Sequence, residues 1–228
     1  MIIEIEGFQV ELTRKPVKYI NLRITSQGSI KVSAPKRSSL TNISKFVKDK
    51  SSWIKSHQER LKDQEILLNM HARADENHFF LGDRYKLIIK ESDIKKGITL
   101  NKSFMHCFAP ANASLHETQA ILHHWYRKQM ETLLPALIKK WEPIIGVRVL
   151  EYGIKTMKTR WGSCNTVAKR IWINLHLIQK PLICLEYVLV HEMVHLLEPS
   201  HNKRFHSLMT KFMPKWPEYR LLLNTKLV

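Results

Sequence analysis

The strongest constraint on the fold comes from one apolar stretch in the last quarter of the chain. Between Pro181 and Leu197 the sequence reads PLICLEYVLVHEMVHLL, which indicates a buried helix. A proline suits the first turn of such a helix, and Pro199 ends it. His191 and His195 are four residues apart, so a helix places both imidazoles on one face, one turn apart. The stretch therefore predicts a core helix that presents two histidines to an interior cleft.

These histidines belong to a His-Glu-x-x-His sequence, a spacing in which one ion can bridge both rings and the glutamate can reach a metal-bound water. His201 follows six residues after His195, beyond the break at Pro199, and can complete three protein ligands with an open fourth position. Zinc would lower the pKa of its water toward ~7, and Glu192 could accept the proton and later deliver it. The sequence predicts Zn²⁺ bound by His191, His195 and His201, with Glu192 as general base.

Other ligand sets remain open. His206 is a rival third ligand, although packing or hydrogen bonding on the following helix suits it better. A carboxylate third ligand would be Glu198, only three residues beyond the motif, or Glu218, which is distant in sequence. The motif also occurs by chance, and its two histidines could be core residues without a metal. Three imidazoles favour zinc, while nickel or copper could occupy the same ligands.

The first 111 residues are predicted to be β-rich with one helix, because short alternating apolar runs dominate them. The predicted elements are, in order, a β-meander over Ile2–Pro35 with a hairpin connection at Ser26–Ser29, a helix over Ser39–Leu61 capped by Ser39 or Thr41, an irregular polar segment over Lys62–His78, a hairpin at Gly82-Asp83, and a strand near Ile98–Phe108.

A change in composition near residue 112 begins a helical portion. Its predicted elements are a helix over Ser114–Trp141 that Pro135 could kink or end, a strand over Arg148–Thr156, a turn-rich loop over Lys158–Asn165, a strand over Arg170–Leu177, the motif helix, and a helix over Lys203–Phe212. Together these elements predict an α+β fold with two portions, residues 1–111 and 112–228.

The segment before the motif helix offers candidate substrate contacts. An exposed edge of the strand Arg170–Leu177, which includes Asn174, could hold an extended peptide by main-chain hydrogen bonds. Arg160 and Ser163 could contact a substrate carbonyl, a developing oxyanion or a phosphate. We therefore expect Arg160 and Asn174 to bind substrate.

The remaining residues of the loop before that strand have simpler expected roles. Trp161 and Gly162 are predicted to build a tight turn packed under the motif helix. Cys164 could be a nucleophile, but no base stands at a recognisable spacing, so a small buried side chain is the better interpretation.

Charge is the least ordinary part of the composition. The chain has 37 Lys+Arg and 20 Asp+Glu, which gives a formal net charge of +17. Such a positive field favours an anionic partner such as a nucleotide or nucleic acid, although scattered lysines also serve solubility. No run of about 18 apolar residues occurs, and the first residues lack the pattern of a signal peptide. The three cysteines, without a CxxC pair, argue against a disulfide framework, so we expect a cytoplasmic protein with no membrane partner.

Several motifs together resemble the YgjP-like metal-dependent hydrolases, which are related to the SprT-like and WLM-type zinc peptidases. They are Met157-Lys-Thr-Arg-Trp-Gly-Ser-Cys164, Ile173-Asn174-Leu175 with Pro181, Glu186 through His195, His201 with Phe205, Val32-Ser-Ala-Pro35, Phe46-Val-Lys-Asp-Lys50 with Trp53-Ile54, and Leu81-Gly82 with Tyr85. The resemblance implies a zincin-like minimal metallopeptidase core after a β-rich N-terminal portion. It also implies His191, His195 and His201 as ligands and Glu192 as the catalytic acid/base. Met193-Val194 and Ser200-His201-Asn202 depart from the commoner residues there without removing a ligand.

Three functions are compatible with these observations. The first is a zinc metallopeptidase that cleaves a peptide or protein substrate. The second uses the same metal site to hydrolyse a phosphoanhydride such as a nucleoside triphosphate, which would require several lysines and arginines near the metal. The third is a nucleic-acid-associated, SprT-like protease, although no zinc finger or clustered basic helix supports it.

Overall fold

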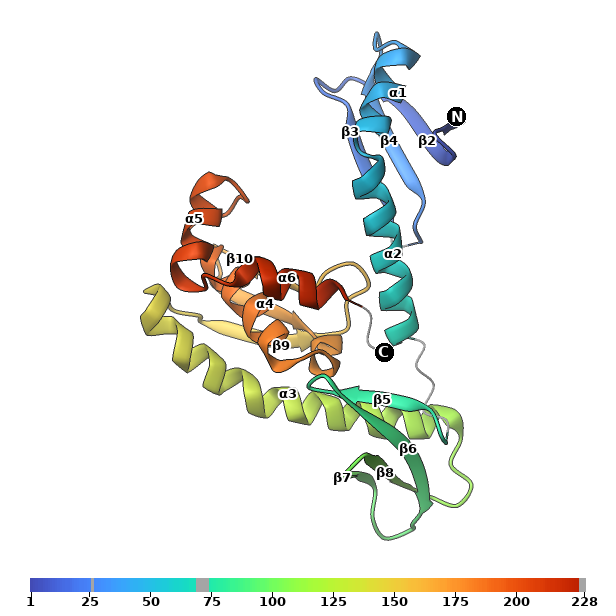
Figure 1. The fold of residues 1–228 in the computed structure, drawn as a ribbon, viewed down its shortest axis with the longest axis vertical. Coiled ribbons are helices and arrows are strands. Elements are labelled where there is room, and N and C mark those ends of the chain that lie inside the picture. The colour runs from blue at the N-terminus through green and yellow to red at the C-terminus, as the bar shows by residue number, and fades with distance from the viewer. Residues whose placement is uncertain (26, 69–73, 226–228) are drawn as a thin grey trace. The chain divides into compact units, whose positions relative to one another are not determined.

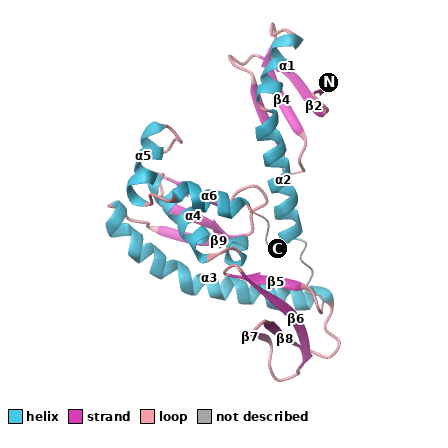
Figure 2. Ribbon diagram, in the orientation of Figure 1, coloured by secondary structure: helices cyan, strands magenta, loops and turns pink. Residues whose placement is uncertain are grey.

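The computed structural model describes residues 1–25, 27–68 and 74–225, and these form two compact units, Met1–Leu67 and Leu68–Val228 (Figure 1). Helices and sheets alternate along the chain, and a sheet opens the N-terminal portion (Figure 2). The predicted α+β class is therefore confirmed. The predicted division at residues 111 and 112 falls inside the second unit.

The first unit contains a four-stranded sheet covered by helices. Its elements are β1 (Ile2–Ile5), β2 (Phe8–Lys15), β3 (Asn21–Ile24), β4 (Ile30–Pro35), α1 (Leu40–Asp49) and α2 (Ser51–Leu68). The strand order is β1-β2-β4-β3, and β2 runs parallel to β4, so the prediction of a simple meander is wrong. The hairpin between β3 and β4 is confirmed by their antiparallel pairing, with Ser26 of its connection outside the described residues.

The predicted single helix over Ser39–Leu61 is two helices. Ser39 caps α1, and its side chain accepts a hydrogen bond from the backbone N–H of Asn42, as one of the two predicted caps required. Lys50 leaves the helical conformation and separates α1 from α2. Apolar side chains of α1 and α2, including Ile43 and Ile54, meet the apolar face of the sheet in a core that belongs to this unit alone. The segment predicted as irregular begins helical, because α2 continues to Leu68; residues 69–73 lie outside the described residues.

A second four-stranded sheet begins the second unit. It comprises β5 (Asn77–Phe80), β6 (Asp83–Glu91), β7 (Gly97–Asn101) and β8 (Phe104–Ala109), in the order β5-β6-β8-β7. The predicted hairpin at Gly82-Asp83 is confirmed. The single strand predicted near Ile98–Phe108 is instead the hairpin β7–β8, which reverses at Lys102, a residue with φ of 51°.

Helix α3 (Leu115–Ile145) joins this sheet to the rest of the second unit. Ser114 and Glu117 form a capping box at its start, and Gly146, with φ of 76°, ends it in the left-handed conformation. The helix passes through Pro135 without ending there. Side chains of β6, β7 and β8 share one apolar core with α3, which is why the second unit begins well before residue 112.

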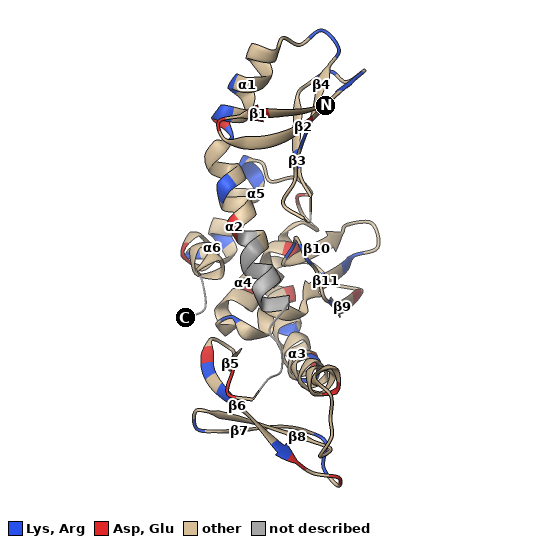
Figure 3. Cartoon of the chain, turned by 90° about the vertical axis from the view of Figure 1, so that its right-hand side faces the viewer, with Lys and Arg blue, Asp and Glu red and all other residues tan. Residues whose placement is uncertain are grey.

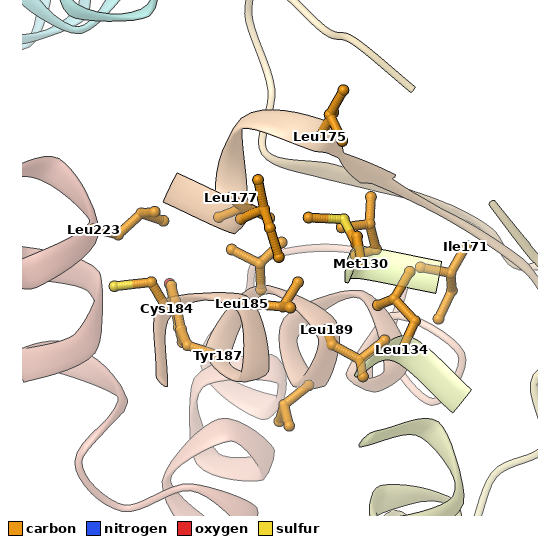
Figure 4. Close-up of a cluster of buried hydrophobic side chains, with 14 of the residues drawn as sticks. Met130, Leu134, Ile171, Leu175, Leu177, Cys184, Leu185, Tyr187, Leu189 and Leu223 are labelled. Atoms are coloured by element: carbon orange, nitrogen blue, oxygen red, sulfur yellow. The ribbon is translucent and has the colours of Figure 1, made fainter. Parts of the chain in front are cut away.

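The last part of the chain builds a three-stranded sheet and its covering helices. Its elements are β9 (Glu151–Lys155), β10 (Gly162–Asn165), β11 (Arg170–Asn174), the 3-10 helix η1 (Leu175–Gln179), α4 (Leu182–Val194), α5 (Lys203–Phe212) and α6 (Trp216–Asn224). Buried side chains from α3, β11, η1, α4 and α6 meet in the core around α4 (Figure 4). As predicted, the motif helix is buried over most of its length. Among the described residues, no helix is long and apolar enough to cross a membrane.

Candidate metal centre

The structure brings together the three histidines predicted as metal ligands. His191 lies in the last turn of α4, His195 is the residue that ends this helix, and His201 follows in the connection to α5. Each histidine offers one ring nitrogen as a ligand atom, and these three nitrogens lie within 4.8 Å of one another. The Nε2 atoms of His191 and His201 are 2.9 Å apart. Three imidazoles that converge in this way fit the ligand set of a transition metal ion.

Local backbone geometry explains how His201 returns to the helix. After α4, the backbone N–H groups of Leu197 and Glu198 donate to the carbonyl oxygen of Val194, so the chain turns tightly before Pro199. Asn202 then caps α5, accepting a hydrogen bond from the N–H of Phe205. A short turn and a capped helix therefore fix His201 opposite the motif.

Phe205 forms the floor of the site. Its side chain is 1% exposed, and its ring centroid lies 4.9 Å from that of His191, 4.6 Å from that of His195 and 4.8 Å from that of His201. Motif spacing alone does not assign this role. The apolar position in an otherwise polar helix start is the signal that could have found it.

Electrostatics keep the three rings neutral, which is the form that binds metal. Burial, reinforced by the neighbouring His195 and His201, lowers the pKa of His191 to about 3. Burial also lowers the pKa values of His195 and His201. The Nδ1 atom of His195 lies 3.2 Å from the carbonyl oxygen of Glu198, which accepts from an Nδ1–H and leaves Nε2 free as a ligand.

Glu192 follows His191 on α4 and is enclosed. Glu192 is 6% exposed. Burial raises the pKa of its carboxyl group to about 8, although the positive charge of Arg160 lowers it. A Cβ atom on Gly162 would lie only 2.7 Å from Oε1 and 2.8 Å from Cγ of Glu192. The predicted packing of Gly162 under the motif helix is therefore confirmed, but Gly162 begins strand β10 instead of lying in a tight turn, and its lack of a side chain makes room for the carboxylate.

The two predicted substrate-binding residues differ in availability. Arg160 is exposed, and its positive charge lowers the pKa of Glu192. Asn174 is fully buried, and its side-chain amide donates to the carbonyl oxygens of Met157 at 2.8 Å and Arg160 at 2.7 Å. Its side-chain oxygen accepts from the backbone N–H groups of Met157 and His176. Because these bonds use the whole amide, Asn174 holds the loop that carries Arg160 and has no polar atom left for a substrate.

The predicted strand edge also needs correction. Strand β11 is the middle strand of the order β10-β11-β9, so both of its edges are already paired. Residues 162–165, predicted as loop, form the edge strand β10, which is antiparallel to β11. Since Trp161 accepts from Asn174 across this pair, the alternation of an antiparallel ladder turns the main-chain groups of Gly162 and Cys164 toward the free edge.

Rival ligands and the candidate nucleophile have other surroundings. The ring of His206 stacks on Trp216, with 5.5 Å between centroids. The carboxylate of Glu198 accepts a hydrogen bond from the hydroxyl of Ser200 at 2.9 Å. Glu218 is exposed in the first turn of α6. Burial, together with Glu192, raises the pKa of the Cys164 thiol to about 11, so the thiol is protonated at neutral pH.

A second arginine approaches the histidines from α6. Burial of Leu223 against Cys184 and Tyr187 holds α6 against α4 (Figure 4). Arg220 lies one turn earlier on α6 and is exposed. Burial and the neighbouring histidines are the larger causes of the low pKa of His191, and the positive charge of Arg220 lowers it further. Within the described ranges, neither Arg160 nor Arg220 is in an ion pair.

Comparison with known proteins gives one match. No curated protein and no solved structure matches the chain significantly. The model of the YgjP-like family, described as a metallopeptidase domain, matches residues 18–226. That range includes the first unit's β3, β4 and helices and nearly all of the second unit, and it agrees with the histidine cluster found at the end of α4. The chain therefore belongs to the YgjP-like family of metal-dependent peptidases.

Proposed function

We propose that this protein is a zinc-dependent metallopeptidase that cleaves an extended peptide bound along β10, with Glu192 as general base. The observation that carries this proposal is the position of the edge strand β10, whose Gly162 lies against Glu192, the residue that follows His191 of the histidine cluster on α4. Three neutral imidazoles favour zinc among the divalent ions, and a tetrahedral zinc held by three protein ligands would take water as its fourth.

The residues of the chain divide the chemistry among them. His191, His195 and His201 would hold the zinc, which when bound would supply a water of lowered pKa and polarise the scissile carbonyl. Glu192 takes the proton from the attacking water and gives it to the leaving amine. Enclosure under Gly162 holds this carboxylate at one place and makes it a stronger base than an exposed glutamate. His191, His195 and His201 remain neutral ligands throughout.

Substrate alignment comes from β10. The main-chain groups of Gly162 and Cys164 face outward and can pair with an extended peptide, as in other complexes formed by strand addition. A peptide in that register passes Glu192, because Gly162 lies against its carboxylate. Arg160, just before the strand, can then donate to the carbonyl oxygen on which negative charge develops.

The two arginines also favour a second candidate function. Arg160 and Arg220 bring unneutralised positive charge to the site from the loop before β10 and from α6. A phosphoanhydride substrate requires such charges near the metal ligands. Hydrolysis of nucleoside triphosphates is therefore the alternative that the same site supports.

Elemental analysis of protein purified without added metal tests the metal assignment first. We expect about one zinc per chain in the wild type, and loss of that zinc in His195→Ala and in His201→Ala. His206→Ala is the matched control, because His206 stacks on Trp216 outside the cluster, and it should retain the metal. A wild type that takes up no metal even when zinc is supplied would overturn the proposal.

Activity assays then separate the two chemistries. Unfolded protein substrates, peptide mixtures and nucleoside triphosphates should be offered to the zinc-loaded wild type and to Glu192→Gln, which keeps the ligands. Cleavage of peptides that disappears in Glu192→Gln supports the peptidase. Hydrolysis of triphosphates alone, dependent on Arg160 and Arg220, would replace it with the second candidate.

A further inference from the structure

The first unit contains a long segment without acidic side chains. From Leu12 to Lys48 the sequence has nine lysines and arginines and no aspartate or glutamate. Two of the acidic residues that border this segment are already paired, since Glu11 bonds Lys31 at 2.8 Å and Glu6 bonds Lys48 at 3.0 Å. The remaining positive charges of the segment therefore have few neighbours that could neutralise them.

The sheet topology gathers five of these nine charges at one end. Strands β2 and β4 are parallel, with Lys15 paired to Pro35, so both strands finish at the same edge of the sheet. Strand β3 is antiparallel to β4 and begins opposite Ser33, which returns the loop over residues 16–20 to that same end. Two separate stretches of chain, the end of β2 with the loop that follows it and the end of β4 with the loop that follows it, therefore meet at this end of the sheet.

Arg14 connects these two stretches. Its guanidinium donates to the carbonyl oxygens of Lys36 at 3.1 Å and Ser38 at 2.6 Å. The loop between β4 and α1, which carries Lys36 and Arg37, is thus held against the end of β2. Figure 3, in which lysine and arginine are blue, shows blue segments on this loop.

We call this surface the basic end, and it consists of Arg14, Lys15, Lys18, Tyr19, Lys36 and Arg37. All six residues are exposed, and in the part of the chain that the structure describes none of the five basic ones is in an ion pair. Helix α1 begins directly after it, and the partial positive charge of a helix N-terminus, here without an acid in the first turn, adds to the field.

An aromatic side chain distinguishes the basic end from an ordinary solubilising surface. Tyr19 is 67% exposed, whereas tyrosine is on average intermediate in burial. The Lys18 ammonium lies 5.4 Å from its ring centroid. An open ring among unpaired cations is the arrangement with which proteins bind single-stranded nucleic acid, because phosphates meet the charges and a base stacks on the ring.

We propose that the basic end binds single-stranded nucleic acid. An acidic protein would complement the charges but would leave the Tyr19 ring without a base to stack on. Insertion into an anionic membrane requires a broad apolar face, and Tyr19 is the only large apolar side chain of the basic end. The basic end belongs to the first unit, which has its own core, and the histidine cluster belongs to the second, so the inference does not rest on the proposed function.

Fluorescence anisotropy with the full chain and a labelled oligothymidylate of about 16 nucleotides tests the proposal. If four of the five cations contact phosphates, the affinity should fall about 50-fold between about 50 and 200 mM salt. The triple variant Lys18→Gln, Lys36→Gln, Arg37→Gln should bind at least about tenfold more weakly at low salt and show a shallower salt dependence. Tyr19→Ala should weaken binding about tenfold and leave the salt dependence unchanged.

The matched control removes three exposed lysines from the second unit, Lys95→Gln, Lys96→Gln and Lys102→Gln, which gives the same change in net charge. We expect it to bind like the wild type. Near-ultraviolet circular dichroism and thermal unfolding establish that all variants are folded. An equal loss in the control and the triple variant, an unaffected Tyr19→Ala, or no binding by the wild type at low salt would each overturn the proposal. Vesicles with anionic lipids serve as a competitor, and stronger binding to them than to the oligonucleotide would overturn it as well.

Discussion

Gly162→Ala is the substitution that most directly tests how the site is built. An alanine Cβ would lie 2.7 Å from Oε1, 2.8 Å from Cγ and 3.0 Å from Cδ of Glu192. Carbon atoms approach each other comfortably at about 3.5–4.0 Å, so the side chain or the strand must move by roughly 0.7 Å or more. The methyl group thus displaces the proposed base while it leaves the three histidines untouched.

The expected loss follows from that displacement. A misplacement of about 1 Å of a reacting group costs on the order of 100-fold in rate, so we expect kcat/KM to fall by about that factor. Overpacking should lower the free energy of unfolding by about 1–3 kcal/mol. Zinc content should remain that of the wild type, because the glycine contacts Glu192 and not a metal ligand.

The assay compares peptide hydrolysis, zinc content and urea unfolding for the wild type, Gly162→Ala and Ser163→Ala. Ser163 is the control, since it is the next residue on β10 and its side chain points to the opposite face of the sheet. Wild-type activity in Gly162→Ala would show that Glu192 does not need this space. Loss of zinc in Gly162→Ala would refute the reasoning differently, because it would mean that β10 supports the ligands themselves.

Three further predictions concern stability. Burial holds the pKa of His78 at about 4 instead of 6.5, so the unfolded chain binds the extra proton between these values and stability falls as the pH drops through that window. When the pH is lowered from about 7.5 to 5, the free energy of unfolding measured in urea should fall by about 2 kcal/mol more for the wild type than for His78→Phe. An equal fall in both proteins would contradict this prediction. The carboxylate of Glu186 accepts a hydrogen bond from Trp141 Nε1 at 2.7 Å and forms an ion pair with Lys140 of α3. Glu186→Leu should therefore lower the free energy of unfolding by about 1–3 kcal/mol, and the variant should retain zinc. The Tyr126 hydroxyl donates to the carbonyl oxygen of Phe79 at 2.8 Å. Tyr126→Phe should lower the free energy of unfolding, measured in urea, by about 1–2 kcal/mol. An unchanged free energy would mean that this carbonyl oxygen finds another donor.

Local patterns in the sequence determined much of what surrounds the metal centre. The motif helix, the long helix after Ser114 and the turn at Gly82 are all recognisable because helical periodicity, capping residues and turn glycines act over a few residues. The i, i+4 spacing likewise places His191 and His195 on one face of any helix that contains them. The clustering of His191 with His195 and the buried character of the helix could therefore be predicted.

Partnerships between distant segments were decided only by the tertiary structure. The sequence of β10 has no alternating apolar pattern, and it is a strand because β11 and α4 offer it hydrogen bonds and a surface to pack on. The same reasoning explains why β2 pairs in parallel with β4, and why Asn174 was mistaken for a substrate contact. Gly162 gained its role from a side chain 30 residues away in the sequence, at Glu192. The periodicity of a segment shows which of its faces is apolar. Which segments become neighbours depends on the packing of the whole chain, because burial of apolar surface and pairing of backbone groups must be satisfied together.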